Sequence, residues 1–273
     1  AEFGTEVIGW VDSIGTVKGE GYDNPPSTTD QVDSSIVRNH INEVSDKMIS
    51  EVEDARNSGD SVGGTICIIV RNVPPGLGQP VFDKLEAQIA KACLSIPACK
   101  GFESGSGFEG TTMRGSQHND LFYTDNSEAG DQIEVDLKVQ TGYTANPVHG
   151  IEKVPDIYTK TNRSGGIQGG ISNGMPLLFR VAFKPTSTIH QQQQTVNESG
   201  QPILLKAGGR HDPCVLPRAV PIVEAAVQLV LTDMMLQQRA IHPEWWLRYS
   251  NTAKAAIEAE LEAKRNTNKS HNV

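Results

Sequence analysis

Residues 210–214, with the sequence RHDPC, carry the side chains best suited to chemistry. A glycine pair before them and Pro213 behind them hold the side chains in fixed directions. Arg210 offers a planar fork of donors for a carboxylate or phosphate. His211 offers an imidazole ring that can exchange a proton, and Asp212 becomes an acid or base where its neighbours desolvate it. The alternative is a helix cap with surface charges. Cys214 is interpreted as a small buried thiol, because no His with Asn or Asp can be assigned to it.

A second candidate is the run 184–188, KPTST, at the end of the alternating apolar pattern of 177–183. It places one cation and three hydroxyls on a stiff turn, which is a suitable set of donors for phosphate. The alternative is an exposed turn with a solvated lysine.

The glycine-rich run Ser164 to Gly174 could let the backbone approach a ligand closely, or it could form only tight turns. Its spacing differs from the GxGxxG pattern of dinucleotide-binding proteins. His118 lies beside Asn119 and Asp120, but no second histidine follows at ligand spacing. We therefore expect His118 to fix a loop by hydrogen bonding, and we expect no metal site.

The composition limits the class of protein. The 273 residues include 24 basic and 33 acidic side chains, so the net charge is −9, and 37% of residues are hydrophobic. These values are typical of a soluble globular domain and argue against a nucleic-acid partner. No apolar run approaches the roughly 20 residues of a membrane span. The four cysteines form no CxxC pair, which favours neither a zinc site nor a disulfide scaffold and indicates a reducing compartment.

Apolar periodicity predicts strands and amphipathic helices in one α/β-type domain, without internal repeats. In the second helix, Phe82, Leu85, Ile89 and Cys93 share the apolar side. The predicted strands cover 6–17, 62–70 and 177–183, and the predicted helices cover 34–58, 80–96, a long stretch from near Pro221, and 253–264. The predicted connections cover 19–31, 72–78, a mixed region over 98–123, an insertion loop or flap over 124–158, 161–174, and a mobile polar turn at 191–194.

Several of these segments, in their order along the chain, resemble the C-terminal part of chorismate synthase. The most specific stretch is RHDPC followed by PRAVPIVEA at 217–225. The other matching blocks are 61–64, 70–78, 82–87, 100–103, 115–120, 162–174 and 183–187. The resemblance covers 1–240 as part of a single domain. The segment 124–158 is longer than the family's usual connection, and 241–273 is a helical and polar extension, so neither inherits a function.

The resemblance implies an α+β fold, a β-α-β sandwich of two antiparallel sheets with helices between them. The chain begins at Ala1 without an initiator Met, directly before an alternating apolar stretch. The family's N-terminal signature, with its catalytic histidine and substrate-gripping arginines, would lie before this residue. We therefore expect an incomplete sandwich that is prone to aggregate, and that alone neither turns over nor binds FMN tightly.

The resemblance also implies a reaction. The family catalyses the anti-1,4-elimination of phosphate from 5-enolpyruvylshikimate 3-phosphate, giving chorismate, and requires reduced FMN. Carried over by position, Asp212 aids proton removal, Arg210 holds flavin or substrate anion, and His211 lies beside them. Lys184, Arg163 and Arg218 are further candidates for a cationic pocket. The implied cofactor contacts are Pro97, Ala98, Gly169, Lys184, Pro185, Thr186, Ser187, Thr188 and Arg210.

The remaining expectations concern partners and place. By resemblance the complete protein is a homotetramer, with no nucleic-acid or membrane partner, and NADPH enters only if a flavin reductase activity is present. Segments 162–174 and 183–188 most resemble plastid enzymes, which favours the chloroplast stroma, with cytoplasm as the alternative. Two other functions stay open: an inactive flavin- or anion-binding module of the same family, and an unrelated phosphate-binding α/β hydrolase. The hydrolase lacks support from a GxSxG or P-loop motif.

Overall fold

The structure is a computed structural model that describes residues 3–124 and 157–250 and the single positions 255 and 259. The predicted insertion loop over 124–158 lies outside the described residues except for position 124 and positions 157–158. The predicted helix over 253–264 also lies outside them, apart from two positions.

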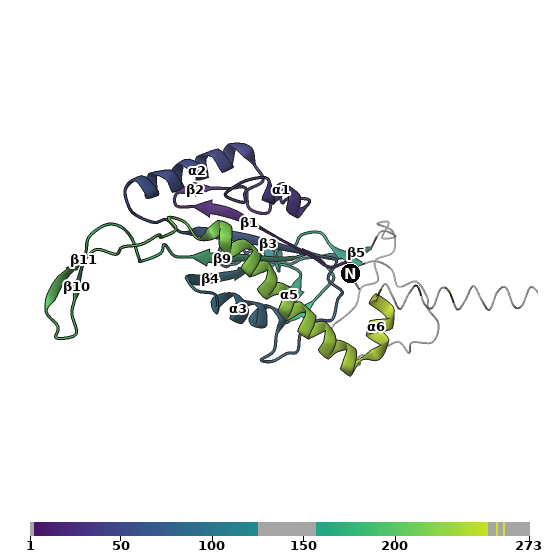
Figure 1. The fold of residues 1–273 in the computed structure, drawn as a ribbon. Helices are drawn as coiled ribbons and strands as arrows, with labels where there is room; N and C mark the ends of the chain where they lie inside the picture. Colours follow the sequence, from purple (N-terminus) through teal and green to yellow (C-terminus); the bar gives the residue numbers. More distant parts are fainter. Residues whose placement is uncertain (1–2, 125–156, 251–254, 256–258, 260–273) are drawn as a thin grey trace, which may run out of the picture.

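A five-stranded antiparallel sheet forms the centre of the molecule, with strand order β2-β1-β3-β9-β4 (Figure 1). β9 covers the predicted residues because its side chains alternate between buried and half-buried, as expected for period-two patterning. The predicted strand over 6–17 is instead a tight hairpin, since the chain reverses at Gly15, where φ is +55°. The strands are β1 (Glu6–Ile14), β2 (Val17–Lys18), β3 (Gly64–Arg71), β4 (Cys99–Ser104) and β9 (Leu177–Phe183).

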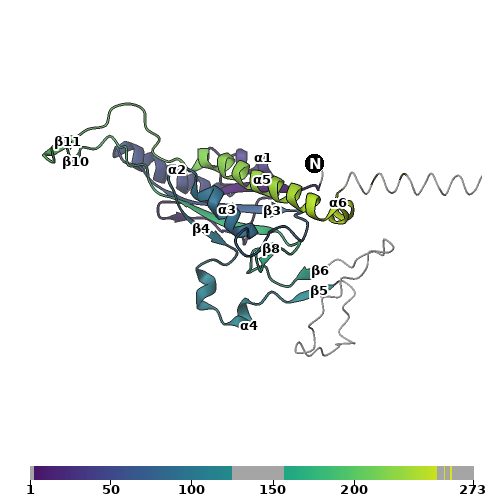
Figure 2. The same cartoon turned by 90° about the horizontal axis from the view of Figure 1, so that it is seen from below.

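Helices cover one face of this sheet (Figure 2). The core lies between this face and the inner sides of the helices, where Ile66, Ile68 and Phe179 pack with Leu231. On the other face, Trp10 and Cys67 form a smaller cluster with Val32 of the first short helix. The helices are α1 (Thr29–Asp33), α2 (Asn42–Asn57), α3 (Leu85–Leu94), α5 (Leu216–Ile241) and α6 (Pro243–Tyr249).

α2 begins later than the periodicity predicts. It begins at Asn42 rather than near residue 34, because Arg38 has a φ of +58° and the buried Asn39 side chain accepts from the Ile41 amide at 2.9 Å. The same Asn39 side chain donates to the Val11 carbonyl, which ties this turn to the sheet.

The starts of α3 and α5 also differ from the prediction. α3 begins at Leu85 because residues 79–83 form a closed turn in which the Asp83 amide donates to the Gln79 carbonyl. Phe82 therefore lies outside the helix and is 89% exposed, so its predicted place on the apolar side is wrong. α5 begins at Leu216, with a proline in its first turn, and Pro221 lies one turn inside the helix.

α5 is also long and apolar enough to cross a membrane, judged by length and composition alone. The sequence analysis considered only uninterrupted apolar runs. It did not find a segment of that length in α5, because polar residues interrupt the apolar residues of this helix. Its inner face is buried against β1, β3 and α3, so we describe α5 as the core helix of the fold.

The predicted mobile turn at 191–194 is wrong, because Gln193 and Gln194 begin a strand. β10 (Gln193–Val196) pairs with β11 (Pro202–Leu205) in a hairpin that projects away from the body of the molecule (Figure 1). The Asn197 side chain closes its turn by accepting from the amides of Ser199 and Gln201.

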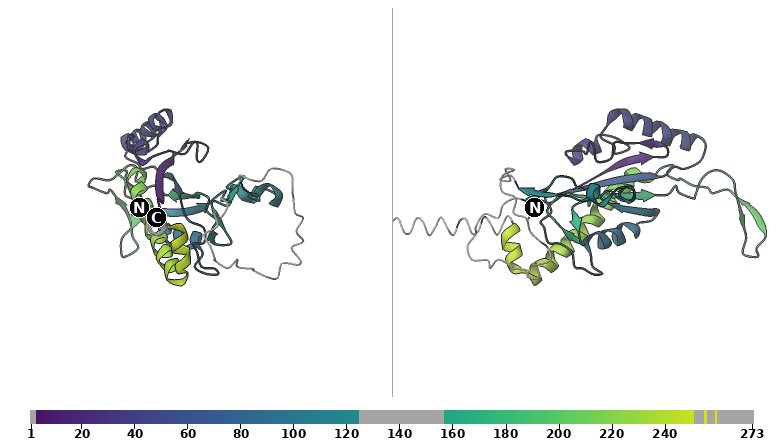
Figure 3. Two further views of the ribbon diagram at one scale, coloured as in Figure 1. Left: turned by 90° about the vertical axis from the view of Figure 1, so that its right-hand side faces the viewer. Right: turned by 180° about the vertical axis from the view of Figure 1, so that it is seen from behind.

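A small lobe lies on the side of the sheet opposite the helices (Figure 3). Together with the large sheet and the helix layer, it gives the mixed α+β class that the resemblance implies. The described residues contain one large sheet, with α2, α3 and α5 on one face and α1 on the other, and their other sheets are two-stranded. The lobe and the hairpin beside it comprise η1 (Glu109–Thr112), α4 (Gly115–His118), β5 (Phe122–Thr124), β6 (Ile157–Thr159), β7 (Ile167–Gln168) and β8 (Ile171–Ser172).

Candidate functional site

The end of β9 brings together three of the segments selected from the sequence. The Lys184 amide donates to the Ala98 carbonyl at 3.0 Å, which places the start of the KPTST turn beside Pro97 and Ala98. The Thr186 hydroxyl lies 3.5 Å from the Asp212 carbonyl oxygen, at the edge of hydrogen-bonding range. Segments that lie far apart in the sequence therefore contact each other at one end of the sheet.

The entry to β3 lies between these segments and joins them. The Ser61 hydroxyl donates to the Thr186 carbonyl at 2.6 Å, and the Val62 amide donates to the Pro213 carbonyl at 2.8 Å. Gly63 is needed here because a Cβ at this position would lie 2.9 Å from Pro185 Cδ. Because both turns are hydrogen-bonded to the residues just before β3, the distance between the two turns is fixed.

Asp212 is held by an ion pair. Arg218, in the first turn of α5, donates to Asp212 Oδ2 at 2.7 Å, and the Asp212 side chain is 30% exposed. His211 Nε2 lies 3.1 Å from the Gly208 carbonyl oxygen, which ties the ring to its own loop. The carboxylate is thus oriented, and it keeps an exposed side from which it could receive a proton.

His190 is a neighbour of this site that the sequence analysis does not select. Its ring lies 5.4 Å from the His211 ring, centroid to centroid. The two histidines meet because the β10–β11 hairpin begins and ends at this point. Both rings border a small cavity of about 40 Å³, which Asp212 and Arg56 also line. The only sequence signal was that His190 lies two positions after Thr188.

The side chains at this end have the donor chemistry for an anion. Lys184 and Arg210 are exposed, and neither forms an ion pair with a carboxylate in the part of the chain described. Ser187 and Thr188, which belong to the same turn as Lys184, are also exposed. Cations with adjacent hydroxyls bind phosphate well. The cavity is too small to enclose a flavin ring, because small-molecule pockets measure about 300–1,000 Å³. The described residues at this end therefore offer donors for a phosphate group but no cavity that could enclose a flavin ring.

Gly169 does not lie with these residues. It is the exposed tip of the β7–β8 hairpin, with a φ of +62°, and no heavy atom lies within 4 Å of an added Cβ. The Leu85 amide donates to the Gly170 carbonyl at 2.9 Å, so the hairpin packs on the start of α3. The seven residues of β9 separate Gly169 from Lys184, which corresponds to about 20 Å of strand.

Two other candidates also lie at that far end. Arg163 lines a different cavity, with Lys160, and does not join Lys184 or Arg210. His118 Nε2 is 2.9 Å from the Ser106 hydroxyl, which is the loop-fixing contact that the sequence predicts. Among the described residues there is no group of three potential metal ligands.

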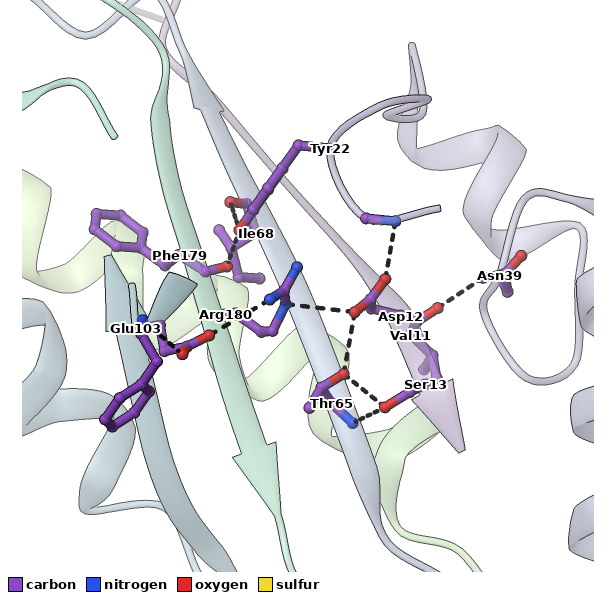
Figure 4. A network of polar contacts seen from close by, with 12 residues as sticks. Val11, Asp12, Ser13, Tyr22, Asn39, Thr65, Ile68, Glu103, Phe179 and Arg180 are labelled. Carbon is purple, nitrogen blue, oxygen red and sulfur yellow. Dashed lines mark hydrogen bonds and ion pairs between the residues drawn. The ribbon is translucent and has the colours of Figure 1, made fainter. Parts of the chain in front are cut away.

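The sequence analysis does not predict a charged network on the face of the sheet opposite α5 (Figure 4). Arg180 of β9 lies 3.4 Å from carboxylate oxygens of both Asp12 and Glu103, and so ties β9 to β1 and β4. Burial raises the pKa of Tyr22 well above its usual value, and the tyrosine hydroxyl donates to the Phe179 carbonyl. The network holds in place the strand that carries the KPTST turn.

The cysteines are buried, unreactive thiols. All four are free and buried. Burial raises the pKa of Cys67 and Cys93 to about 12 and that of Cys214 to about 11, so these thiols stay protonated at neutral pH. This agrees with the interpretation of Cys214 as a small buried residue rather than a nucleophile.

These features define an α+β protein whose antiparallel sheet gathers cations, hydroxyls and one paired carboxylate at a single end. A family model described as chorismate synthase matches residues 1–236. The chain belongs to the chorismate synthase family.

Individual relatives agree with the family model. A chorismate synthase of Leptospira biflexa is 49% identical over 251 residues, covering 92% of this chain and 60% of the relative. One from Synechococcus elongatus is 50% identical over 243 residues, covering 89% and 59%. A chloroplastic chorismate synthase of Capnoides sempervirens is 50% identical over 239 residues, covering 87% and 47%. The chain thus spans about 60% of the length of the first two relatives.

A solved structure has the same fold. A crystal structure of chorismate synthase superposes with a TM-score of 0.63 at 26% identity, covering 86% of this chain and 58% of the other. The mixed sheet-and-helix architecture described above is therefore the architecture of this family.

Proposed function

We propose that this protein acts as a chorismate synthase, catalysing the anti-1,4-elimination of phosphate from 5-enolpyruvylshikimate 3-phosphate to give chorismate, in the biosynthesis of aromatic amino acids. The observation that carries the proposal is the meeting of Thr186 and Asp212. This contact joins the KPTST turn, whose donors suit a phosphate, to the acidic residue of the family's most specific motif.

Each residue at this end has a role that its chemistry suits. The substrate bears a phosphate and two carboxylates, whereas the chain carries a net charge of −9. Local cations must therefore attract it, and Lys184 and Arg210 are exposed for that purpose. Asp212 aids removal of the ring proton, while the pair with Arg218 orients its carboxylate. His211 completes the proposed catalytic group.

Reduced FMN is the proposed cofactor, and when bound it lends electron density to the reacting system. Lys184 and Arg210 would hold its phosphate, together with the three hydroxyls of 186–188, and the Pro97–Ala98 backbone lies alongside them. Gly169 would contact it only from the opposite end of β9. NADPH would take part only through an accompanying flavin reductase activity.

The test is anaerobic turnover of the whole gene product with photoreduced FMN and 5-enolpyruvylshikimate 3-phosphate, measured as chorismate absorbance and phosphate release. We expect the Asp212→Asn variant to lose at least 100-fold in kcat, the lower end of about 10²–10⁴ for acid–base groups. Asp233→Asn, on the exposed side of α5, is the matched control and should retain full activity. An Asp212→Asn variant as active as the control would refute the proposed role.

The same experiment separates the proposal from the inactive alternative. A protein that quenches FMN fluorescence on binding but forms no chorismate is the flavin-binding module. We also propose that the complete protein is a homotetramer, as the resemblance implies. We propose a location in the chloroplast stroma, with cytoplasm as the alternative, because the relatives include cyanobacterial and chloroplastic enzymes. Multi-angle light scattering and the location of a fluorescent fusion of the whole gene product test these two statements.

A further inference from the structure

The small lobe contains a cavity that the proposed reaction does not use. Its volume is about 430 Å³, within the usual range for small-molecule sites, whereas the cavity at Asp212 measures about 40 Å³. Its lining residues come mainly from α4 and its flanks and from the segment that follows β6. Figure 2 shows where α4 and β6 lie in the lobe. The two cavities share no lining residue.

The charge on the walls of this cavity is positive. Lys160 and Arg163 line it, and among the described residues that line it there is no carboxylate. In the part of the chain that the structure describes, neither cation forms an ion pair with an acidic side chain. In a protein of net charge −9, a cavity with two uncompensated cations is a local site of attraction for anions.

A buried carboxylate fixes the backbone that carries these cations. Asp120 is 2% exposed, and it accepts from the Arg163 and Ser164 amides at 2.9 and 2.8 Å and from the Thr161 hydroxyl at 2.6 Å. The Arg163 carbonyl in turn accepts from the Ser106 amide at 2.7 Å. The Asp120 carboxylate binds backbone amides and a hydroxyl rather than the side chains of Lys160 and Arg163. The two cations are therefore held in place, and their charge stays available to a ligand.

The other walls could complete a site for a small organic anion. Ser116 and Asn119 add a hydroxyl and an amide as hydrogen-bonding groups. Met113 and Leu121 supply an apolar surface, and Leu121 is 54% exposed at the edge. We propose that this cavity binds a small molecule that carries a phosphate or carboxylate group, separately from the anion-binding turn at Lys184.

The test is a titration of the whole chain with inorganic phosphate, followed by the amide NMR signals of residues 116–121 and 159–164. We expect these signals to shift with saturation. The double variant Lys160→Gln, Arg163→Gln should weaken the fitted affinity at least tenfold, whereas Lys206→Gln, an exposed cation beside β11, should change it less than twofold. Succinate in place of phosphate decides which anionic group is preferred.

A second background keeps this result separate from the proposed enzyme site. The titration is repeated with Lys184→Gln and Arg210→Gln together, which removes the cations of the other end. We expect the shifts at 116–121 to persist there, whatever the outcome for chorismate formation. Shifts confined to 184–188, or an affinity that does not respond to loss of Lys160 and Arg163, would overturn the inference, provided that circular dichroism shows the variants folded.

Discussion

At the scale of single residues, Asp120 shows how one buried carboxylate organises a loop. Burial raises its pKa, but hydrogen bonds from Thr161, Ser164 and Arg163 outweigh that effect, so its pKa lies below the ordinary value of 3.8. Because the folded pKa is lower than the unfolded one, Asp120 stabilises the native state fully above pH 3.8. That contribution is lost as pH falls through the folded pKa.

We therefore expect Asp120→Asn to lower the free energy of unfolding by about 1–3 kcal/mol at pH 7, because the amide replaces an acceptor with a donor that faces backbone N–H groups. The difference from wild type should shrink below pH 3.8. Urea titrations at pH 7, 5 and 3 measure it. Asp46→Asn, on the exposed side of α2, is the control. A difference that is constant with pH would show that the charge of Asp120 does not matter.

At the scale of elements, α5 and the β10–β11 hairpin differ in how they contribute to stability. Leu231 of α5 is 2% exposed within the core, whereas Leu204 of β11 is 63% exposed. Removing a buried leucine leaves a cavity, and removing an exposed one does not. An isolated two-stranded hairpin also adds little stability of its own.

Leu231→Ala should lower the free energy of unfolding by about 2–5 kcal/mol. Leu204→Ala should change it by less than about 0.5 kcal/mol. Both variants replace leucine by alanine, so chemical denaturation compares the loss of unfolding free energy at the two positions directly. A loss of several kcal/mol at Leu204 would mean that the hairpin is packed against another surface in solution.

At the scale of the whole molecule, the outer side of α5 presents an apolar stripe. Ile222, Leu229 and Leu236, at seven-residue spacing, are 52%, 72% and 54% exposed. In the two-sheet sandwich that the family implies, helices lie between sheets, so this stripe is the surface on which a second sheet would pack. Contiguous exposed apolar residues promote association when they are not covered.

Leu229→Lys should therefore reduce self-association of the 273-residue chain at high concentration and leave its free energy of unfolding within about 0.5 kcal/mol. Static light scattering against concentration measures the first effect. Glu53→Gln, at an exposed position of α2, raises the net charge by the same single unit and controls for net charge. Unchanged scattering in Leu229→Lys would locate the association elsewhere.

Local pattern predicted some elements well and others poorly. β9 was predicted because its alternation is uninterrupted, and the long helix because its buried residues recur at helical spacing. The start of α2 was missed because a buried Asn39 turn overrides the apolar period before it. The β10–β11 hairpin was missed because its glutamines lack the composition of a strand, and only pairing across Asn197 makes one.

The sequence by itself determined the family, the α+β class and the two motifs at 184–188 and 210–214, because residue identity and order along the chain carry that information. Only the tertiary structure decided which candidates are neighbours. It placed Thr186 beside Asp212 and His190 beside His211, and it moved Gly169 and Arg163 to the other end of β9. The reason is physical: strand order and register set the distances between loops, and they arise from burial of the whole sheet rather than from local spacing.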